Sequence, residues 1–404
     1  MSNINSDNNK DKLQKLNFGL HLLENDQIGT YYSELFNNET KQLVHTSPVT
    51  NTILFKDTLV FISDIPDYLD TIKSTDSKEI ILKKINTYQG SLINLSKYNT
   101  IEDYLINEIS TKERSEIRRR QKRLDTCIKP VYKMYYGNIS KKEYDIIFND
   151  YRQMLLRRLE QKQSYWEELD YWKDRYATTF NLINEKKACI YVIYHNDTPI
   201  SIYINSVYDK IIFNEVVAYD IDYSRFNIGI LIFIKIVEWA INNGFDLIDM
   251  SKGDFSYKER FRNGTYTFQN HIIYDTNSMN ASIKAKALIL KQNIIYIVLP
   301  WLKKLKLNKL NTLYKRIKNR HVFKEFSSQP EIIIETKKLL AIDNFNNLKL
   351  INPNKDDYTC LKKPIIDFAF LNVEFVDEIM VYMDINNKEF YLKGANSFQK
   401  IVIK

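Results

Sequence analysis

Four polar side chains near residue 250 are of the types that move protons and stabilise developing negative charge. Asp249 lies near the end of a predicted strand, and Asp254, Tyr257 and Lys258 follow shortly after it. Transfer of an acyl group to an amine or hydroxyl needs a base for the nucleophile and a donor for the oxyanion. Asp254 is the candidate base, Lys258 the candidate oxyanion or phosphate contact, and Tyr257 the candidate proton donor. Asp249 is a candidate substrate-binding residue, which could orient its neighbours or simply pair with Lys252.

Two of these residues also have plain structural roles. Asp is a common N-cap, so Asp254 could cap the short turn that contains Tyr257. Lys258 could be an ordinary surface charge. Both interpretations stay open on the sequence. Neither His195, expected in a turn, nor His271, expected in a strand, is predicted to be a catalyst.

A second candidate site is the start of a helix predicted at 228–243, which follows a strand at 211–220. Asn227 is a favourable N-cap for this helix. The free backbone N–H groups and the positive dipole end of such a terminus suit a pyrophosphate. Arg225 would add a charge-assisted contact, whereas Gly229 could equally serve to pack the helix against a sheet.

A third candidate is a cation-rich helix that begins after Ser110. Ser110 and Glu113 have the spacing of a capping box, and cations crowd the C-terminal half of the helix, where they suit its dipole. Arg118 and Arg119 are the candidate substrate-binding residues, as an anion site for phosphate groups. A solvated helix face is the alternative, since charge runs usually face water.

The composition excludes several familiar sites. The chain has nine glycines among 404 residues, and no two are close enough for G-x-G-x-x-G or for a Walker-type phosphate loop. Its three cysteines are too far apart for a zinc site or a disulfide framework, and no metal is expected. No apolar run is long enough for a transmembrane helix, and the polar residues 1–14 do not resemble a signal peptide. We expect a cytoplasmic protein.

The positive charge of this protein is concentrated in one segment. The net charge is +8, but twelve Lys or Arg and no acidic residue lie between Asp275 and Glu325, so the rest of the chain sums to −4. The segment is aliphatic and basic, and Pro300 is expected to divide it into two amphipathic helices. It could adsorb to anionic headgroups, bind tRNA, or pack on the protein with a solvated basic edge.

Periodicity predicts alternating strands and helices around the candidates. A strand at 245–250 should run parallel to the one at 211–220, because a helix separates them, and a strand at 265–275 should close the sheet. Ser140 and Glu143 should cap a helical region up to residue 187. Further strands are expected at 52–62 (as a hairpin), 90–96, 128–137, 188–197 and 198–209, and short alternating runs over 330–404 indicate a β-rich appendage.

This order of elements resembles the GNAT acyltransferase fold, an α/β (α+β) class. The run A-Y-D-x-x-Y-S-x-x-x-x-G at Ala218 to Gly229 and the "D…GD…YK..F" ending up to Phe261 resemble CelD/BcsL-type acetyltransferases, which are related to FemAB-type aminoacyl transferases. The upstream S-x-K-x-R…R-R pattern at 110–119 fits the same subfamily. The usual phosphate loop, Q/R-x-x-G-x-G/A, is only partly kept, since Arg225 is followed by F-N-I-G-I.

The resemblance covers roughly Leu92 to Asp275 and implies a partly duplicated GNAT-like arrangement. Its expected parts are an N-terminal GNAT-like half at 15–125 and a C-terminal GNAT acyltransferase domain at 126–275. Composition and patterning add a disordered tail at 1–14, basic amphipathic helices at 276–329 and the β-rich appendage at 330–404.

The resemblance also implies an enzyme that takes an acyl group from acyl-CoA to an amine or hydroxyl of a sugar or cell-envelope precursor. Tyr257 would then protonate the leaving thiolate. An aminoacyl-tRNA-dependent transferase and a non-catalytic scaffold of a glycan-assembly complex are the alternatives. The expected partners are a glycan or lipid-linked acceptor and, through 284–324, the inner face of the membrane. The residues implied to bind the CoA donor are Val217, Ala218, Arg225, Asn227, Ile228, Gly229 and Ile230.

Overall fold

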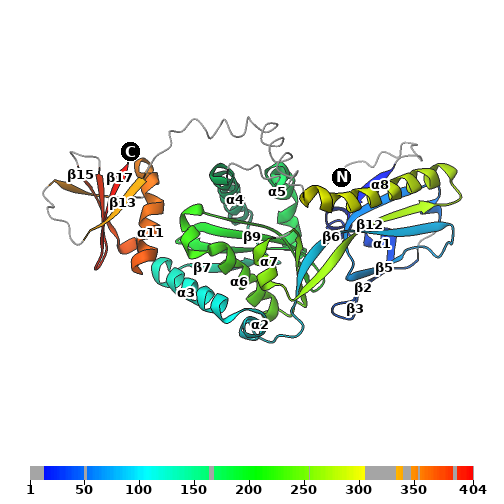
Figure 1. Ribbon diagram of the computed structural model, residues 1–404, viewed down its shortest axis with the longest axis horizontal. Coiled ribbons are helices and arrows are strands. Elements are labelled where there is room, and N and C mark those ends of the chain that lie inside the picture. The colour runs from blue at the N-terminus through cyan, green and yellow to red at the C-terminus, as the bar shows by residue number, and fades with distance from the viewer. Residues whose placement is uncertain are drawn as a thin grey trace. The chain divides into compact units, whose positions relative to one another are not determined.

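The protein combines helices with a large mixed sheet, so the α/β (α+β) class predicted from the sequence is confirmed. Its structure is a computed structural model (Figure 1) that describes residues 13–49, 52–162, 168–253, 255–304, 334–339, 347–353, 355–384 and 389–403. Contacts divide the chain into two units. The first contains Met1–Glu108, Ser206–Asn214 and Ala240–Asn311, and the second contains Ile109–Asn205, Glu215–Trp239 and Thr312–Lys404.

The first unit combines two sheets with short helices and one long helix. Its strands are β1 (Gln14–Asn17), β2 (Tyr32–Asn37), β3 (Gln42–Thr46), β4 (Leu59–Pro66), β5 (Leu69–Lys73), β6 (Ile80–Asn94), β11 (Leu247–Lys252) and β12 (Gly264–Asp275). Its helices and helical turns are η1 (Phe18–Leu23), α1 (Ile28–Tyr31), η2 (Thr52–Phe55), α2 (Ile101–Glu108), α7 (Ser256–Phe261) and α8 (Met279–Lys304).

The strand order in this unit corrects two predictions. The main sheet runs β1-β4-β12-β6-β11 and continues to the first residues of β10 (Ile211–Tyr219), and β2, β3 and β5 form a separate sheet. The parallel pairing of β10 with β11 was predicted correctly. However, β12 does not close the sheet, because it pairs with β6 on one side and β4 on the other. The expected hairpin at 52–62 is also wrong. Its strand β4 pairs with β12 and β1, which come from other parts of the chain.

The second unit has one sheet with α4 and α5 packed against it, further helices, and a second sheet from the C-terminal region. Its helices and helical turns are α3 (Thr111–Ile128), α4 (Lys141–Lys162), α5 (Glu168–Asn184), η3 (Ile221–Phe226), most of α6 (Ile228–Asn242), η4 (Asp356–Leu361), α11 (Lys362–Asn372) and η5 (Val376–Glu378). Its strands are β7 (Val131–Tyr135), β8 (Ala188–His195), most of β9 (Thr198–Tyr208), the second part of β10, β13 (Ile334–Leu339), β14 (Leu348–Ile351), β15 (Met380–Asp384), β16 (Glu389–Lys393) and β17 (Phe398–Ile403).

The core of the second unit lies between α4, α5 and the strand order β10-β9-β8-β7. Tyr144, Phe148 and Tyr151 on α4 repeat at helical spacing and are fully buried. They pack with alternate residues of β8, such as Ile190 and Val192. Burying these aromatic rings fixes the helical layer on one face of the sheet.

Capping contacts form at the starts of three helices, including the two predicted at Ser110 and Ser140. Thr100 and Asp103 exchange backbone and side-chain bonds at the start of α2, and the Glu113 N–H donates to the Ser110 hydroxyl at the start of α3. Ser140 and Glu143 do the same for α4. Each box uses backbone donors that a helix start leaves unsatisfied.

The C-terminal segment contains a helix that the sequence did not predict. β13 to β17 form the expected sheet, but the run FAFLNVEFV at 368–376 includes the end of α11 rather than a strand. Ile365, Ile366, Phe368 and Ala369 are buried on α11, which lies beside α3 (Figure 1) and packs on η3. The apolar residues of α11 are buried against α3 and η3. A single sequence does not show that this tertiary contact is present.

Pro300 does not divide two helices, because α8 continues through it to Lys304. Proline removes one hydrogen bond and bends a helix without having to end it. Residues 305–329 of the predicted basic helices lie outside the described residues. Among the helices that the structure describes, none has both the length and the hydropathy to cross a membrane.

We expect Gly90→Ala to destabilise the first unit. A Cβ atom at Gly90 would lie 2.2 Å from Cζ of Tyr266 on the neighbouring strand, so the ring would have to move. Such overpacking costs about 1–3 kcal/mol. Gly19→Ala is the matched control, since its Cβ would meet its nearest atom at an ordinary 3.5 Å. Urea unfolding measures both, and equal midpoints for the two variants would contradict the prediction.

Candidate functional site

Asp249 is a wholly buried carboxylate held by three donors in the first unit. The Tyr68 hydroxyl donates to Oδ2 at 2.7 Å, and the Tyr266 hydroxyl donates to Oδ1 at 2.5 Å. The Ser251 N–H also donates to Oδ1, at 2.6 Å. The two tyrosine rings pack edge to face with centroids 5.0 Å apart. Asp249 therefore orients its neighbours, which is one of its two predicted roles, and its assignment to substrate binding stays a prediction.

Burial controls the ionisation of this carboxyl group. Desolvation raises the pKa of Asp249 to about 6, although the hydroxyl donors and the nearby Lys258 favour the charged form. The same burial, together with the Asp249 charge, raises the pKa of Tyr68 and Tyr266 well above the usual value. Asp249 can thus exchange a proton near neutral pH while both tyrosines keep theirs.

The chain after β11 turns sharply and is locked by Lys258. Ser251 and Gly253 have positive φ angles of 61° and 109°, and non-glycine residues rarely take such angles. The Lys258 ammonium group donates to the carbonyl oxygens of Ser251 at 3.1 Å and Lys252 at 2.6 Å. Its residue is only 4% exposed. Lys258 is therefore not a surface charge, and its oxyanion role stays a prediction.

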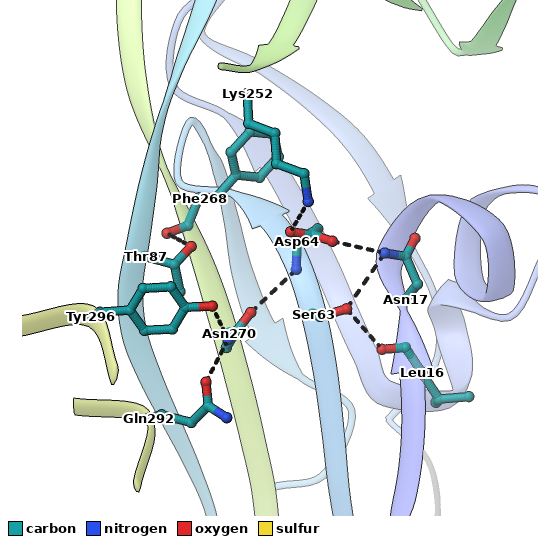
Figure 2. Close-up of polar contacts among 10 residues, drawn as sticks. All are labelled: Leu16, Asn17, Ser63, Asp64, Thr87, Lys252, Phe268, Asn270, Gln292 and Tyr296. Atoms are coloured by element: carbon teal, nitrogen blue, oxygen red, sulfur yellow. Dashed lines mark hydrogen bonds and ion pairs between the residues drawn. The ribbon is translucent and has the colours of Figure 1, made fainter. Parts of the chain in front are cut away.

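The other residues of the predicted catalytic group have different surroundings. Lys252 does not pair with Asp249, because its Nζ lies 3.1 Å from Asp64 Oδ1 (Figure 2). Tyr257 is half-buried on α7, and burial raises the pKa of its hydroxyl, which therefore stays protonated at neutral pH. Asp254, the candidate base, lies outside the described residues.

In the second unit, buried charges hold the loop that follows β10. Asp220 accepts from the Arg157 guanidinium at 2.5 Å and the Lys362 ammonium at 2.7 Å, and Arg157 also donates to Asp222 at 2.9 Å. Burial raises the pKa of Asp220, but Lys362 and Arg157 outweigh it and hold the pKa below its usual range. Asp220, the aspartate of the A-Y-D motif, thus helps to fix η3. Within η3, the Tyr223 hydroxyl lies 2.7 Å from His195 Nδ1.

The predicted donor-binding residues lie at the start of α6. The Asn227 carbonyl accepts from Ile230 N–H at 2.9 Å and Leu231 N–H at 3.2 Å. Ile228 and Gly229 are the first two residues of α6. The first N–H groups of a helix have no carbonyl group of the same helix to bind. Asn227 does not have the extended backbone of a usual N-cap. Its φ is 57°, a left-handed angle that asparagine accepts more readily than most residues.

The strand before this loop separates two of the other candidates. Ala218 is buried in the core beneath α4 and α5. Its neighbour Val217 is half-buried and points to the opposite face of β10, as does Tyr219. The Tyr219 ring lies close to Gly229, and a Cβ atom added to Gly229 would be 3.2 Å from this ring. Gly229 therefore allows α6 to pack on β10, which is the structural role left open by the sequence.

Arg225 is engaged by the C-terminal segment. Its Nε lies 2.8 Å from Asp367 Oδ1 on α11, and its carbonyl accepts from the Arg120 guanidinium. About half of the Arg225 side chain is exposed. A phosphate contact by Arg225 would therefore compete with Asp367, and this predicted role stays a prediction.

The cation-rich helix α3 serves two purposes. Arg119 donates to Glu116 one turn before it and is mostly exposed, and Arg118 is exposed as well. This arrangement favours the solvated face over the anion site. On another face, Arg123 donates to the Phe370 carbonyl at 2.8 Å, so part of the cation cluster binds α11.

Sequence reasoning missed a cation near the start of α6. The Arg158 guanidinium on α4 lies 5.0 Å from the centroid of the Tyr219 ring, the ring that also borders Gly229. Burial and the nearby Arg158 charge lower the pKa of Lys162, so two cations stand close together there. Arg158 lies in a long charged helix without a motif, and no sequence signal sets it apart. Among the described residues, no group of three or more His, Cys, Asp or Glu could hold a metal ion.

We expect Asp249→Asn to remove a pH dependence of stability. The carboxyl group binds its proton more tightly in the folded state, so it favours folding below about pH 4 and loses that contribution as the pH rises through about 6. Between these limits the wild type should lose on the order of 3 kcal/mol relative to the variant. Urea unfolding of both proteins from pH 4 to 7 measures this change, and parallel stability curves would contradict it.

Lys258→Met should cost more stability than Lys252→Met. The first change leaves two carbonyl oxygens without a buried donor, which costs about 1–3 kcal/mol. The second removes an exposed ion pair with Asp64, worth about 1 kcal/mol or less. Thermal unfolding of both variants tests the difference. Equal losses would show that Lys258 does not lock the turn.

Comparison with known families identifies one segment of the chain. Residues 111–259 match the family model described as an acetyltransferase (GNAT) domain. No curated protein matches the chain.

Two solved structures resemble parts of this chain. The C-terminal domain of a putative lysylphosphatidylglycerol synthetase from Agrobacterium fabrum is 11% identical, with a TM-score of 0.36 over 59% of this chain and 73% of that one. FemX is 12% identical, with a TM-score of 0.38 over 56% of this chain and 74% of that one. At these TM-scores the likenesses do not bear on function. The family match shows that the segment at 111–259 is a GNAT-type acetyltransferase domain.

Proposed function

We propose that this protein is an acyltransferase that takes its acyl group from a CoA thioester. The observation that carries the proposal is the family match over 111–259, which contains the loop before α6. A transferase of the CelD/BcsL type, acting on an amine or hydroxyl of a sugar or cell-envelope precursor, is the form we favour. The acceptor class rests on the motif at Ala218 to Gly229 and its continuation to Phe261.

The start of α6 supports binding of a CoA pyrophosphate. Ile228 and Gly229 offer two N–H groups at the positive end of the helix. Arg158 and Lys162 add cations on the neighbouring α4. The residues present therefore fit an anionic donor group.

The departure from the usual glycine pattern does not block this fit. Ile228 stands where that pattern has its first glycine, but its side chain is fully buried. Asn227 supplies the positive φ at the turn. Gly229 is the glycine of this turn, and an added Cβ there would meet the Tyr219 ring at 3.2 Å.

The proposed transfer needs few groups from the protein. A CoA thioester supplies the activated acyl carbon. The acceptor amine or hydroxyl forms a bond to this carbon and gives up a proton to a base, for which Asp254 is the candidate. The carbon–sulfur bond breaks, and the thiolate takes a proton, for which Tyr257 is the candidate donor. Burial raises the pKa of Tyr257, so its hydroxyl carries a proton at neutral pH and holds it more tightly than a free phenol.

We expect CoA and acyl-CoA to raise the melting temperature of the full chain. A ligand at a hundred times its Kd adds about 2.7 kcal/mol to stability. Arg158→Gln should weaken this binding about tenfold through loss of a charge-assisted contact. Arg152→Gln is the matched control, because Arg152 is also on α4 and its guanidinium also lies over an aromatic ring, 5.8 Å from the centroid of Trp172 on α5.

Charged tRNA in a parallel titration separates the alternatives. A shift with charged tRNA and none with any CoA thioester would replace our proposal with an aminoacyl-tRNA-dependent transferase. No shift with either donor would favour the non-catalytic scaffold. Equal effects of Arg158→Gln and Arg152→Gln would keep CoA as the donor and exclude Arg158 from its site.

A further inference from the structure

Helix α8 presents an apolar stripe to solvent. Met279, Ile283, Leu290, Ile294, Ile297 and Val298 are between 41% and 78% exposed. Ile283, Leu290 and Ile297 follow one another at seven-residue intervals, which is about two helical turns, and the other three lie within the same face. Soluble proteins seldom expose an aliphatic row of this length without a partner.

The opposite face of α8 already has its partner within the first unit. Ala285 is fully buried against Leu59, Ile85 and Ile272, and Leu288 and Ile289 pack at the edge of this cluster. Farther along the helix, the Asn270 amide on β12 donates to Gln292 at 3.1 Å and to the Tyr296 hydroxyl at 3.4 Å (Figure 2). The sheet therefore fixes the rotation of α8 about its own axis. The outward stripe is a consequence of this packing and is not free to turn inward.

Cations border the stripe on both sides. With about 100° per residue, Lys284 and Lys291 fall on one flank and Lys286 on the other. All three are exposed. No acidic residue occurs between Asp275 and Glu325, so nothing within the helix neutralises these charges. The surface is aliphatic along its centre and positive along its edges.

We propose that α8 lies on an anionic lipid surface, with its aliphatic stripe among the acyl chains and its lysines at the headgroups. Lysine stems can extend along an apolar surface while the ammonium groups reach the phosphates. An amphipathic helix of this charge pattern binds the interface through both contributions. This proposal does not depend on the proposed acyltransferase activity.

Charge and side-chain type favour lipid over other occupants. A second copy of the chain would bring the same lysines against one another, which costs free energy at an interface. Single-stranded nucleic acid is bound by cations together with stacking aromatic rings. The exposed stripe is aliphatic and contains no aromatic residue at its six positions.

Co-sedimentation of the full chain with vesicles tests the proposal. We expect binding to vesicles of phosphatidylcholine mixed with phosphatidylglycerol, and much weaker binding to phosphatidylcholine alone. The triple variant Leu290→Gln, Ile294→Gln, Ile297→Gln should lower the partition coefficient by more than about tenfold. Changing Lys284, Lys286 and Lys291 to Gln should lower it roughly a hundredfold on the anionic vesicles only, at about 1 kcal/mol per lysine.

A matched control replaces three exposed aliphatic residues on other elements with Gln. Ile106, Val131 and Leu350 are 55%, 57% and 59% exposed, close to the values on α8, and their replacement should leave vesicle binding within about twofold. CoA-induced thermal shifts of the α8 variants should equal those of the wild type, which separates this proposal from the proposed function.

Three results would overturn the proposal. One is failure of the wild type to sediment with anionic vesicles at low salt. Another is a dimer in light scattering that the Leu290, Ile294, Ile297 variant converts to a monomer, since the stripe would then bind a second copy. Equal binding by the control and the α8 variants would also exclude the stripe as the lipid-binding surface.

Discussion

The first unit depends on one buried carboxylate. Asp249 accepts hydrogen bonds from Tyr68, which follows β4, and from Tyr266 on β12, while β11 itself carries Asp249. The three segments meet on these two oxygen atoms. A buried ionisable group without partners would cost several kcal/mol, so this arrangement is stable only when both hydroxyls are in place. The same constraint makes Gly90 necessary, because the Tyr266 ring fills the space that a side chain there would need.

The strained turn after β11 follows from that anchor. The Ser251 N–H is drawn to Asp249 at the cost of a positive φ angle, and Lys258 compensates by binding the carbonyl groups that the turn exposes. Strained backbone persists where surrounding contacts overdetermine it, and such positions are common at functional sites. The turn is therefore rigid around a group whose pKa, about 6, lies close to neutral pH.

In the second unit, ion pairs hold the loop before α6 in place. Asp220 binds Lys362, and Arg225 binds Asp367, so two opposite ion pairs join the loop before α6 to α11. Helix α11 of the C-terminal segment thus helps to hold the loop that leads into the candidate donor site. Helix α8 in the first unit shows a different balance, because apolar packing satisfies only one of its two apolar faces.

The sequence by itself determined the order of the strands and of the helix at 228–242 between residues 188 and 275, and the capping residues of α3 and α4, because these depend on periodicity and on hydrogen bonds between residues three or four apart. It also identified Lys258 as a residue of interest. Only the tertiary structure decided that β12 lies inside the sheet, that Asp249 binds Tyr68, 181 residues away, and that Arg225 faces Asp367. Those contacts join segments that are distant in the chain. The free energy of these contacts depends on which surfaces meet in the folded protein, and a local sequence pattern does not indicate which surfaces those are.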